Sequence, residues 1–422
     1  MQPMKSPVRY SWREVNSLNN IGQYETAQQA AVRLGVTPRA IQKWAAAGKL
    51  PGAVKHGKSW LIPKDAVISE ETQVGDHAIP NSVPDVYQLT PFRITMPLLN
   101  SAYPIGKAME YIEAMPDPDD RNIALGEYYF FSGQSDKAAS IVAEYQDSHD
   151  PSLRFSANLI ATFANLAGGH THLTRFAIHN LQTQVRMGLA TDSPPKLHAI
   201  GIFTATTASV LLHSPLPNIP PLEEYMRYLP GGLKLYACYI LAHKAYLEGD
   251  YSRALATADM GVAISPEIFP IAFVYCHIIT AIALMNMKRP KEALARLEKA
   301  WAIAEPDNLL QPFAEHHGLL QGLIEVFFKD KYPEIHKQID KITYAFSAGW
   351  RAVHNPDTKH EVADNLSTLD FTIAMLYSRD WTAAEIGAHL GLSDRTVYRH
   401  IDTIYSKLGI LSQEELSQYM LK

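Results

Sequence analysis

Two segments near opposite ends of the chain share one spacing of residues, and this spacing constrains the fold more than any other feature. The first reads Ala31-Val-Arg-Leu-Gly35-Val-Thr37-Pro-Arg-Ala-Ile41, and the second reads Gly387-Ala-His-Leu-Gly391-Leu-Ser393-Asp-Arg-Thr-Val397. In such a frame the glycine ends one helix in the left-handed conformation, and the hydroxyl side chain caps the next helix. The small residue ahead of the glycine lets the two helices cross closely. Both segments therefore predict a pair of helices joined by a tight turn.

The first helix of each pair also has a recognisable start. Thr26 and Gln29 in one segment, and Thr382 and Glu385 in the other, have the spacing of a capping box. In a capping box two side chains satisfy the free N–H groups at the beginning of a helix. Two matched frames with matched caps favour helix-turn-helix units. Such a unit can also serve protein packing alone, so the frame by itself leaves both uses open.

The N-terminal unit, residues 21–68, continues past its second helix into an apolar hairpin. Val54 and Trp60-Leu61-Ile62 predict two short strands that turn at His56-Gly57. With the helix at 38–47, the segment resembles the excisionase-like, MerR-related winged helix family. The resemblance implies that this helix lies in the major groove of DNA and that the hairpin, or wing, contacts the neighbouring backbone.

Side chains can be assigned to the two sides of this expected winged helix. The resemblance implies an inward face formed by Ile41, Trp44 and Ala45. The residues that would face the bases or meet phosphate are Arg39, Gln42 and Lys43 on the helix and Lys55 and Lys58 on the wing.

The C-terminal unit, residues 360–422, resembles the LuxR-type DNA-binding domain. The segments that carry the likeness are Thr382 to Gly387, Ser393 to Ile401 and Lys407 to Ile410. The family implies four helices, of which the third reads the major groove and the fourth, residues 413–420, pairs two protomers. The residues expected at DNA are Arg395, Thr396, Tyr398, Arg399 and Lys407.

This unit departs from the family in places. An Arg-Glu pair is usual in its first helix, where this chain has Leu369-Asp370, and Tyr398 replaces a frequent lysine. Residues 366–411 carry four Lys/Arg against five Asp/Glu. Because phosphate neutralisation supplies much of the affinity for DNA, an interaction role for this unit stays open.

Between the units, residues 98–355 show helical periodicity and a weak internal repeat. Gly126 and Ala242 each precede a turn glycine, Gly133 or Gly249, by seven residues, and a small residue follows that glycine by five. A looser third copy turns at Arg289-Pro290. This stretch resembles a degenerate tetratricopeptide repeat, which implies stacked helix pairs around a continuous core and a concave binding face. Five tyrosines could line that face or pack within hairpins: Tyr225, Tyr228, Tyr236, Tyr239 and Tyr246.

Charge is distributed unevenly along the chain. The whole sequence carries a net charge of −5, with 47% hydrophobic and 19% charged residues. Residues 21–68, however, hold seven Lys/Arg and two Asp/Glu, a net +5, whereas residues 69–97 are acidic and contain four prolines. We therefore expect a basic N-terminal unit, a semi-extended linker at 69–97 and a large buried helical middle.

Catalytic and membrane interpretations are weaker. Gly52 to Ser59 matches the P-loop pattern, but Trp60-Leu61-Ile62 follows it where a P-loop requires a helix. The pairs His170/His172 and His316/His317 lack metal-site spacing, and Cys238 and Cys276 are expected to be buried thiols. Two cysteines indicate a reducing cytoplasm. The uncharged run from Ile268 to Met287 is long enough to span a bilayer, yet it lies within the helical repeat.

These features predict a mainly α protein, a helical-repeat solenoid flanked by two helix-turn-helix domains, the N-terminal one with a small β-wing. The predicted function is a cytoplasmic, bacterial-type transcription regulator that binds double-stranded DNA, with no enzymatic activity, cofactor, metal or membrane span. A peptide, small molecule or protein on the repeats would act as effector, and residues 413–420 would form a homodimer. The alternative is a repeat scaffold whose terminal domains bind protein partners.

Overall fold

The computed structural model describes residues 24–27, 30–31, 38–47, 52–56, 59–64, 93–189, 194–214, 218–354 and 366–420, with the single residues Leu50 and Ala66. The chain divides into two compact units, Met1–Thr90 and Pro91–Lys422. Predicted residues Gly35, Thr37 and Lys58 lie outside the described residues, and so does the side chain of Arg39.

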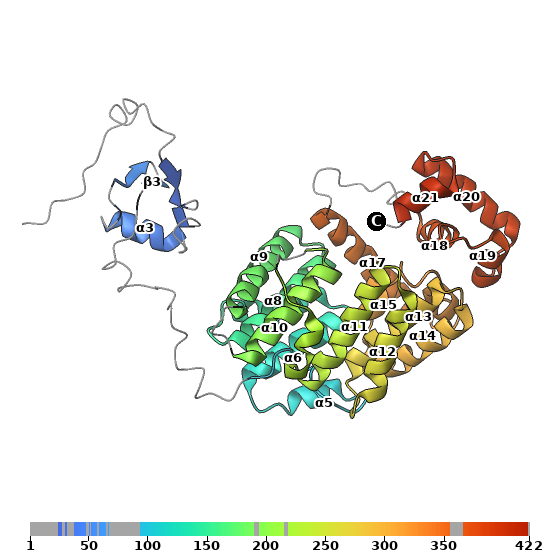
Figure 1. The fold of residues 1–422 in the computed structure, drawn as a ribbon, viewed down its shortest axis with the longest axis horizontal. Helices are drawn as coiled ribbons and strands as arrows, with labels where there is room; N and C mark the ends of the chain where they lie inside the picture. The colour runs from blue at the N-terminus through green and yellow to red at the C-terminus, as the bar shows by residue number, and fades with distance from the viewer. Residues whose placement is uncertain are drawn as a thin grey trace, which may run out of the picture. The chain divides into compact units, whose positions relative to one another are not determined.

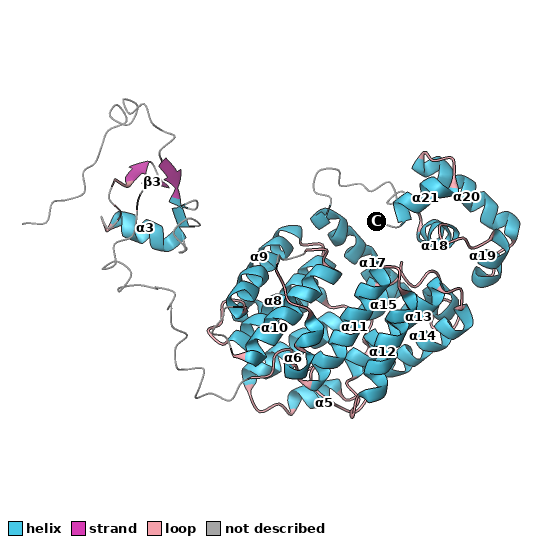
Figure 2. Cartoon of the chain, viewed as in Figure 1, coloured by secondary structure: helices cyan, strands magenta, loops and turns pink. Residues whose placement is uncertain are grey.

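In its described residues the first unit contains helix α3 and a small sheet. Helix α3 (Pro38–Ala46) is the second helix of the predicted pair. Strands β2 (Val54–His56) and β3 (Ser59–Pro63) pair antiparallel, with Val54 opposite Leu61 and Lys55 opposite Trp60. This hairpin, seen in Figure 2, is the predicted β-wing.

A third strand was not expected from the sequence. Strand β1 (Tyr24–Thr26) pairs with β3, so that the sheet order is β1-β3-β2. Ala27, the residue after Thr26, is already helical, which agrees with the predicted helix start. A three-residue strand carries too little alternation to be recognised in a sequence, and here β1 forms because the edge of β3 offers it hydrogen bonds.

The second unit is built almost wholly of helices (Figure 1). The structure therefore confirms that the chain is mainly α, with a repeat-like helical unit and a small β-wing in the N-terminal unit. Its helices before the C-terminal domain are α5 (Ala108–Glu113), α6 (Pro118–Phe131), α7 (Ser135–Val142), α8 (Pro151–Ala167), α9 (Thr171–Gly188), α10 (Pro195–Leu211), α11 (Gly231–Leu247), α12 (Tyr251–Ile264), α13 (Pro270–Asn286), α14 (Pro290–Ala304), α15 (Gln311–Glu315), α16 (Leu323–Phe328) and α17 (Pro333–His354), with short 3-10 turns η3 (Ala143–Tyr145), η4 (Leu222–Glu224), η5 (Met226–Tyr228) and η6 (Glu305–Asp307). The C-terminal helices are α18 (Thr368–Tyr377), α19 (Ala383–Leu390), α20 (Asp394–Leu408) and α21 (Gln413–Met420).

The internal repeat corresponds to helical hairpins. The turn glycines Gly133 and Gly249 adopt φ angles of 78° and 77°, between α6 and α7 and between α11 and α12. A Cβ on Gly126 would lie 2.5 Å from Val142 Cγ1, and Ala242 has no exposed surface. The small residues therefore stand where two helices touch, as the spacing predicts.

The segment before the first helix is packed into this unit. Glu127 on α6 is fully buried and accepts the backbone N–H groups of Leu98 and Leu99, both at 2.8 Å. Asp307 accepts the N–H groups of Gly106 and Ala108 from about 200 residues away in sequence. Residues 93–97, which the proline density assigned to the linker, lie in the helical unit: Ser152 on α8 donates to the backbone oxygen of Arg93, and the N–H of Met96 donates to Ser156 Oγ.

Helix α17 runs back across the stack. It contacts α15 and α16 at one end and α8 and α9 at the other. A Cβ on Gly349 would lie 1.9 Å from the backbone oxygen of Leu166, so the two helices cross at this glycine. Phe346 and Trp350 stack on each other at a centroid distance of 6.1 Å, and both pack on Leu166 and Leu212. Helices distant in sequence are held together in this way.

The apolar run at 268–287 forms α13, whose side chains are buried among neighbouring helices. Within the part of the chain that the structure describes, no helix is long and apolar enough to cross a membrane. The run is the core helix of the repeat, as its position in the periodicity indicated.

Glu127 provides a test of this anchoring. We expect Glu127→Ala to lower the free energy of unfolding of the second unit by about 2–5 kcal/mol, because two buried N–H groups lose their acceptor. Glu113→Ala, at an exposed position on α5, should change it by less than about 0.5 kcal/mol. Denaturant unfolding followed by circular dichroism measures both. Equal stabilities of the two variants would contradict the anchoring role.

Burial also raises the pKa of Glu127 to about 8, against the lowering effect of the N–H groups of Leu98 and Leu99. The protonated form is therefore the more stable one in the folded state. Its contribution is complete below pH 4.5, the ordinary pKa, and is lost as the pH rises through about 8. We expect the stability of the wild type relative to Glu127→Gln to fall over this range in unfolding curves recorded as a function of pH.

Candidate nucleic-acid interfaces

Helix α3 separates an inward face from an outward one. Ile41, Trp44 and Ala45 are buried, at 0%, 3% and 4% exposure, and form the core of the first unit with Ile62 of β3. Gln42 and Lys43 are exposed on the opposite side. The predicted orientation of the helix is therefore confirmed where its side chains are described.

The wing presents Lys55 to solvent. Lys55 lies on β2 opposite Trp60, which is half-buried against the core of the unit. The strand that follows the P-loop-like segment is β3, where a P-loop would lead into a helix. Lys55, the basic residue of this segment that the structure describes in full, therefore belongs to a β-strand.

The C-terminal unit contains the predicted pair of helices with the predicted caps. Thr382 and Glu385 form a capping box at the start of α19, and Gly391 ends α19 with a φ of 69°. Ser393 caps α20 by accepting the N–H of Thr396. A Cβ on Gly387 would lie 2.6 Å from the backbone oxygen of Leu392, so the turn leaves room for glycine alone.

Helix α20 has one apolar and one polar face. Val397, Ile401, Ile404 and Leu408 are buried against α18 and α19, as their spacing predicted. The outward face carries a short polar row with one exposed aromatic ring, formed by Arg395, Tyr398, Arg399 and Asp402. A helix of this kind can enter a major groove, although its charge is mixed.

Asp370 on α18 fixes the position of α20. Its carboxylate accepts hydrogen bonds from His400 Nδ1 at 2.7 Å and from Lys407 Nζ at 2.8 Å, and it closes a capping box with Ser367. Burial alone would raise the pKa of Asp370, but the hydrogen bonds from Lys407, His400 and Ser367 outweigh it and lower the pKa to about 2. The carboxylate is thus ionised and joins two helices.

These contacts change how two predicted DNA-binding residues are placed. Lys407 is engaged by Asp370 inside the domain, whereas the family resemblance suggested a contact with DNA. Thr396 is half-buried, and its hydroxyl lies 2.8 Å from that of Ser393. Thr396 supports α20 through its contact with Ser393, and Lys407 stays exposed while it pairs with Asp370. The other exposed predicted residues are Arg395, Tyr398 and Arg399.

A cluster of buried tyrosine and histidine side chains inside the repeat was not predicted from the sequence. Tyr236, Tyr239 and Tyr275 pack on one another between α11 and α13, with centroids 4.9–5.1 Å apart. His316 lies 2.9 Å from the Tyr239 hydroxyl, and burial lowers the pKa of this histidine to about 4. Three of the five singled-out tyrosines, Tyr236, Tyr239 and Tyr246, are thus core residues. No sequence motif joins these positions, which only the fold brings together.

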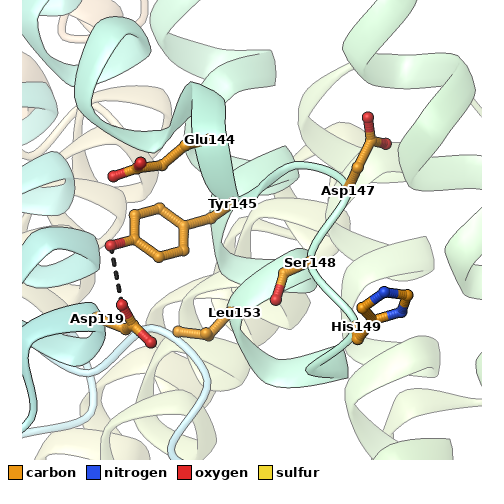
Figure 3. A pocket seen from close by; sticks show the side chains of 7 residues that line it. All are labelled: Asp119, Glu144, Tyr145, Asp147, Ser148, His149 and Leu153. Atoms are coloured by element: carbon orange, nitrogen blue, oxygen red, sulfur yellow. Dashed lines mark hydrogen bonds between the residues drawn. The ribbon is translucent and has the colours of Figure 1, made fainter.

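A shallow hollow lies beside η3. It encloses about 440 Å³ and is lined by Asp119, Glu144, Tyr145, Asp147, Ser148, His149 and Leu153 (Figure 3). The Tyr145 hydroxyl donates to Asp119 at 3.1 Å.

Across the described residues no group of three or more His, Cys, Asp or Glu side chains is placed to hold a metal ion.

Comparison with known proteins bears on the N-terminal unit. A family model described as a helix-turn-helix domain matches residues 26–69. No curated protein and no solved structure matches the chain. The match spans α3 and the hairpin, and it supports a helix-turn-helix domain at the N-terminal end. The likenesses of the other regions to LuxR-type domains and tetratricopeptide repeats stay predictions.

Asp370→Asn tests the contact between α18 and α20. Since the pKa of Asp370 falls from 3.8 to about 2, we expect a loss of about 2 kcal/mol of unfolding free energy near neutral pH. The stabilisation is present above pH 3.8 and disappears as the pH falls toward 2, so the two stabilities should converge in acid. The control is Asp402→Asn, at an exposed carboxylate of α20. Urea unfolding across this pH range measures both, and an Asp370→Asn protein as stable as the wild type would contradict the prediction.

Proposed function

We propose that the chain is a DNA-binding transcription regulator with no enzymatic activity of its own. Its N-terminal helix-turn-helix binds double-stranded DNA, its C-terminal unit makes a second DNA contact, and the helical repeats carry the site for an effector. The observation that carries the proposal is the helix-turn-helix match at residues 26–69 together with the exposed side chains of Gln42 and Lys43 on α3.

The N-terminal contact is supported by charge and geometry. The unit has a net charge of +5 over residues 21–68, which favours the phosphate backbone. Gln42 and Lys43 point away from the core on the helix that would enter the groove, and Lys55 lies on the wing. In this arrangement α3 reads base edges while the wing binds phosphate, and the excisionase-like family implies the same division of work.

The C-terminal contact is supported by the geometry of α19 and α20. Both caps, the tight glycine turn and the exposed row of Arg395, Tyr398 and Arg399 suit a recognition helix. The LuxR-type resemblance adds that α21 would pair two protomers. Because the net charge of residues 366–411 is −1, this contact contributes modest affinity alone and gains from the N-terminal one when both reach the same duplex.

An alternative for the C-terminal unit is protein binding. Its mixed charge favours this alternative. In that case the chain is a scaffold, and the N-terminal domain is its sole DNA contact. The regulator and the scaffold differ in whether Arg395 and Arg399 affect retention of DNA.

The N-terminal contact can be tested with charge-matched variants of the full chain. We expect Lys43→Ala with Gln42→Ala to weaken binding to a duplex library by about tenfold or more, because base contacts and a phosphate contact are lost. Lys55→Ala alone should reduce the slope of log K against log salt by about one unit. The control is Lys64→Ala, an exposed lysine just past the end of β3, away from the wing turn.

The C-terminal contact is tested in the same assay. Arg395→Ala with Arg399→Ala should weaken DNA binding further, while Lys329→Ala with Lys341→Ala removes the same charge from exposed positions elsewhere in the second unit. Electrophoretic mobility shift or fluorescence anisotropy at low salt measures both. If the arginine pair behaves like the lysine pair in every state of the chain, the scaffold alternative holds for this unit.

A further inference from the structure

The C-terminal helix-turn-helix contacts the helical repeat along one side. Lys288, just past the end of α13, donates to the backbone oxygen of Asp380 at 2.7 Å and lies 3.7 Å from the Glu385 carboxylate. Arg379 Nη2 donates to the Tyr246 hydroxyl at 3.0 Å, at the end of α11. These polar contacts tie the turn between α18 and α19, and the first turn of α19, to two repeat helices.

The segment between α15 and α16 supplies the rest of this contact. A Cβ on Gly322 would lie 2.5 Å from Leu390 Cδ2 and 3.0 Å from Thr372 Cγ2. His389 Nε2 lies 3.0 Å from the backbone oxygen of Gln321 and donates to it. The far end of α19 is therefore pressed against a glycine turn, which leaves no space between the two domains.

The repeat contacts α19, the helix that would lie along the DNA backbone. In helix-turn-helix complexes the second helix lies in the major groove, while the first helix crosses the phosphate backbone. Here α19 is the first helix: His389 and Leu390 at its end pack on the repeat, and Glu385, although exposed, lies beside Lys288. Helix α20 keeps Arg395 and Arg399 exposed, so the recognition surface is free while one end of the backbone-facing helix is held against the repeat.

The contact also leaves buried polar groups without partners. Both polar atoms of the Gln321 side chain, Nε and Nη1 of Arg379, and Nε1 of Trp381 find no hydrogen-bond partner among the described residues. Each such group costs free energy relative to its hydrated state. Separation of the two domains would let water reach those of these groups that lie at the contact, and this offsets part of the free energy that the contact provides.

We propose that the helical repeat holds the C-terminal helix-turn-helix in a docked state that keeps α19 from the DNA backbone, and that release of this contact opens the second DNA site. The inference rests on the proposed function, since it assigns regulation to that same site. The repeat is then both the scaffold of the regulator and the element that masks one of its DNA contacts.

The test uses the full chain carrying Gln42→Ala and Lys43→Ala, so that binding reports on the C-terminal unit. Lys288→Glu removes the bond to Asp380 and places a negative charge beside Glu385. Lys291→Glu, on an exposed position of α14, makes the same change of charge as a control. Added negative charge by itself weakens DNA binding, so a gain for Lys288→Glu alone reports release.

Two measurements give the expected result. Hydrogen exchange in residues 318–322 and 385–390 should rise for Lys288→Glu and not for Lys291→Glu. The apparent Kd for duplex DNA should fall by about tenfold for Lys288→Glu, because the apparent Kd varies inversely with the competent fraction. Tyr246→Phe, which removes the acceptor of Arg379, should shift both measurements in the same direction by a smaller factor.

Other outcomes separate the inference from the proposed function. Faster exchange without tighter DNA binding would overturn the inference, and so would unchanged exchange in both Lys288→Glu and Tyr246→Phe, because the contacts would then not hold a docked state. If Arg395→Ala with Arg399→Ala changes DNA binding in neither the docked nor the released chain, the C-terminal unit is not a DNA contact, and the proposed function itself fails for this unit.

Discussion

The close approach of helices at residues too small to separate them is the constraint on which the second unit depends. At Gly387 a Cβ would meet the backbone of the turn at 2.6 Å, and at Gly349 a Cβ would meet the backbone of α8 at 1.9 Å. Gly126 plays the same role within a repeat hairpin. Since helices pack by fitting side chains between one another, the absence of a side chain at a crossing decides how near two axes can come. The turn between α19 and α20 and the crossings within the helical stack therefore both depend on glycine.

Buried carboxyl groups stabilise the structure where apolar packing ends. Glu127 anchors the segment that enters the stack, Asp307 joins residues about 200 positions apart, and Asp370 sets α20 on α18. Burial of a carboxyl group costs desolvation energy, which is offset where the group accepts N–H groups, is protonated or pairs with a cation. Asp370 stood out in the sequence as a departure from the resemblance to LuxR-type domains, and the structure gives it a physical role as the acceptor of His400 and Lys407.

The second unit joins the helical repeats and the C-terminal helix pair in one compact body. The segment between α15 and α16 touches α19, while Thr343 of α17 donates to the backbone oxygen of Ala314 in α15, just ahead of that segment. A partner that displaces α17 from the stack would therefore act on the residues that hold the helix-turn-helix. These contacts link the position of α17 in the stack to the proposed docked state of α19.

The local features of this protein could be predicted from its sequence. The caps of α19 and α20, the left-handed glycines, the inward face of α3 and the β-wing all follow from interactions within a few positions of one another, so Thr382, Gly391, Ile41 and Val54 lie as their spacing predicted. The strand β1, the pairing of Lys407 with Asp370, the cluster of Tyr236, Tyr239 and Tyr275, and the docking of α19 on Gly322 depend on partners far away in the chain. Those partners meet only after the helices have packed, and no spacing within a segment records them. The helix caps, the glycine turns and the β-wing were thus set locally, whereas the tertiary structure decided where β1 forms and which basic and aromatic side chains remain available at the surface.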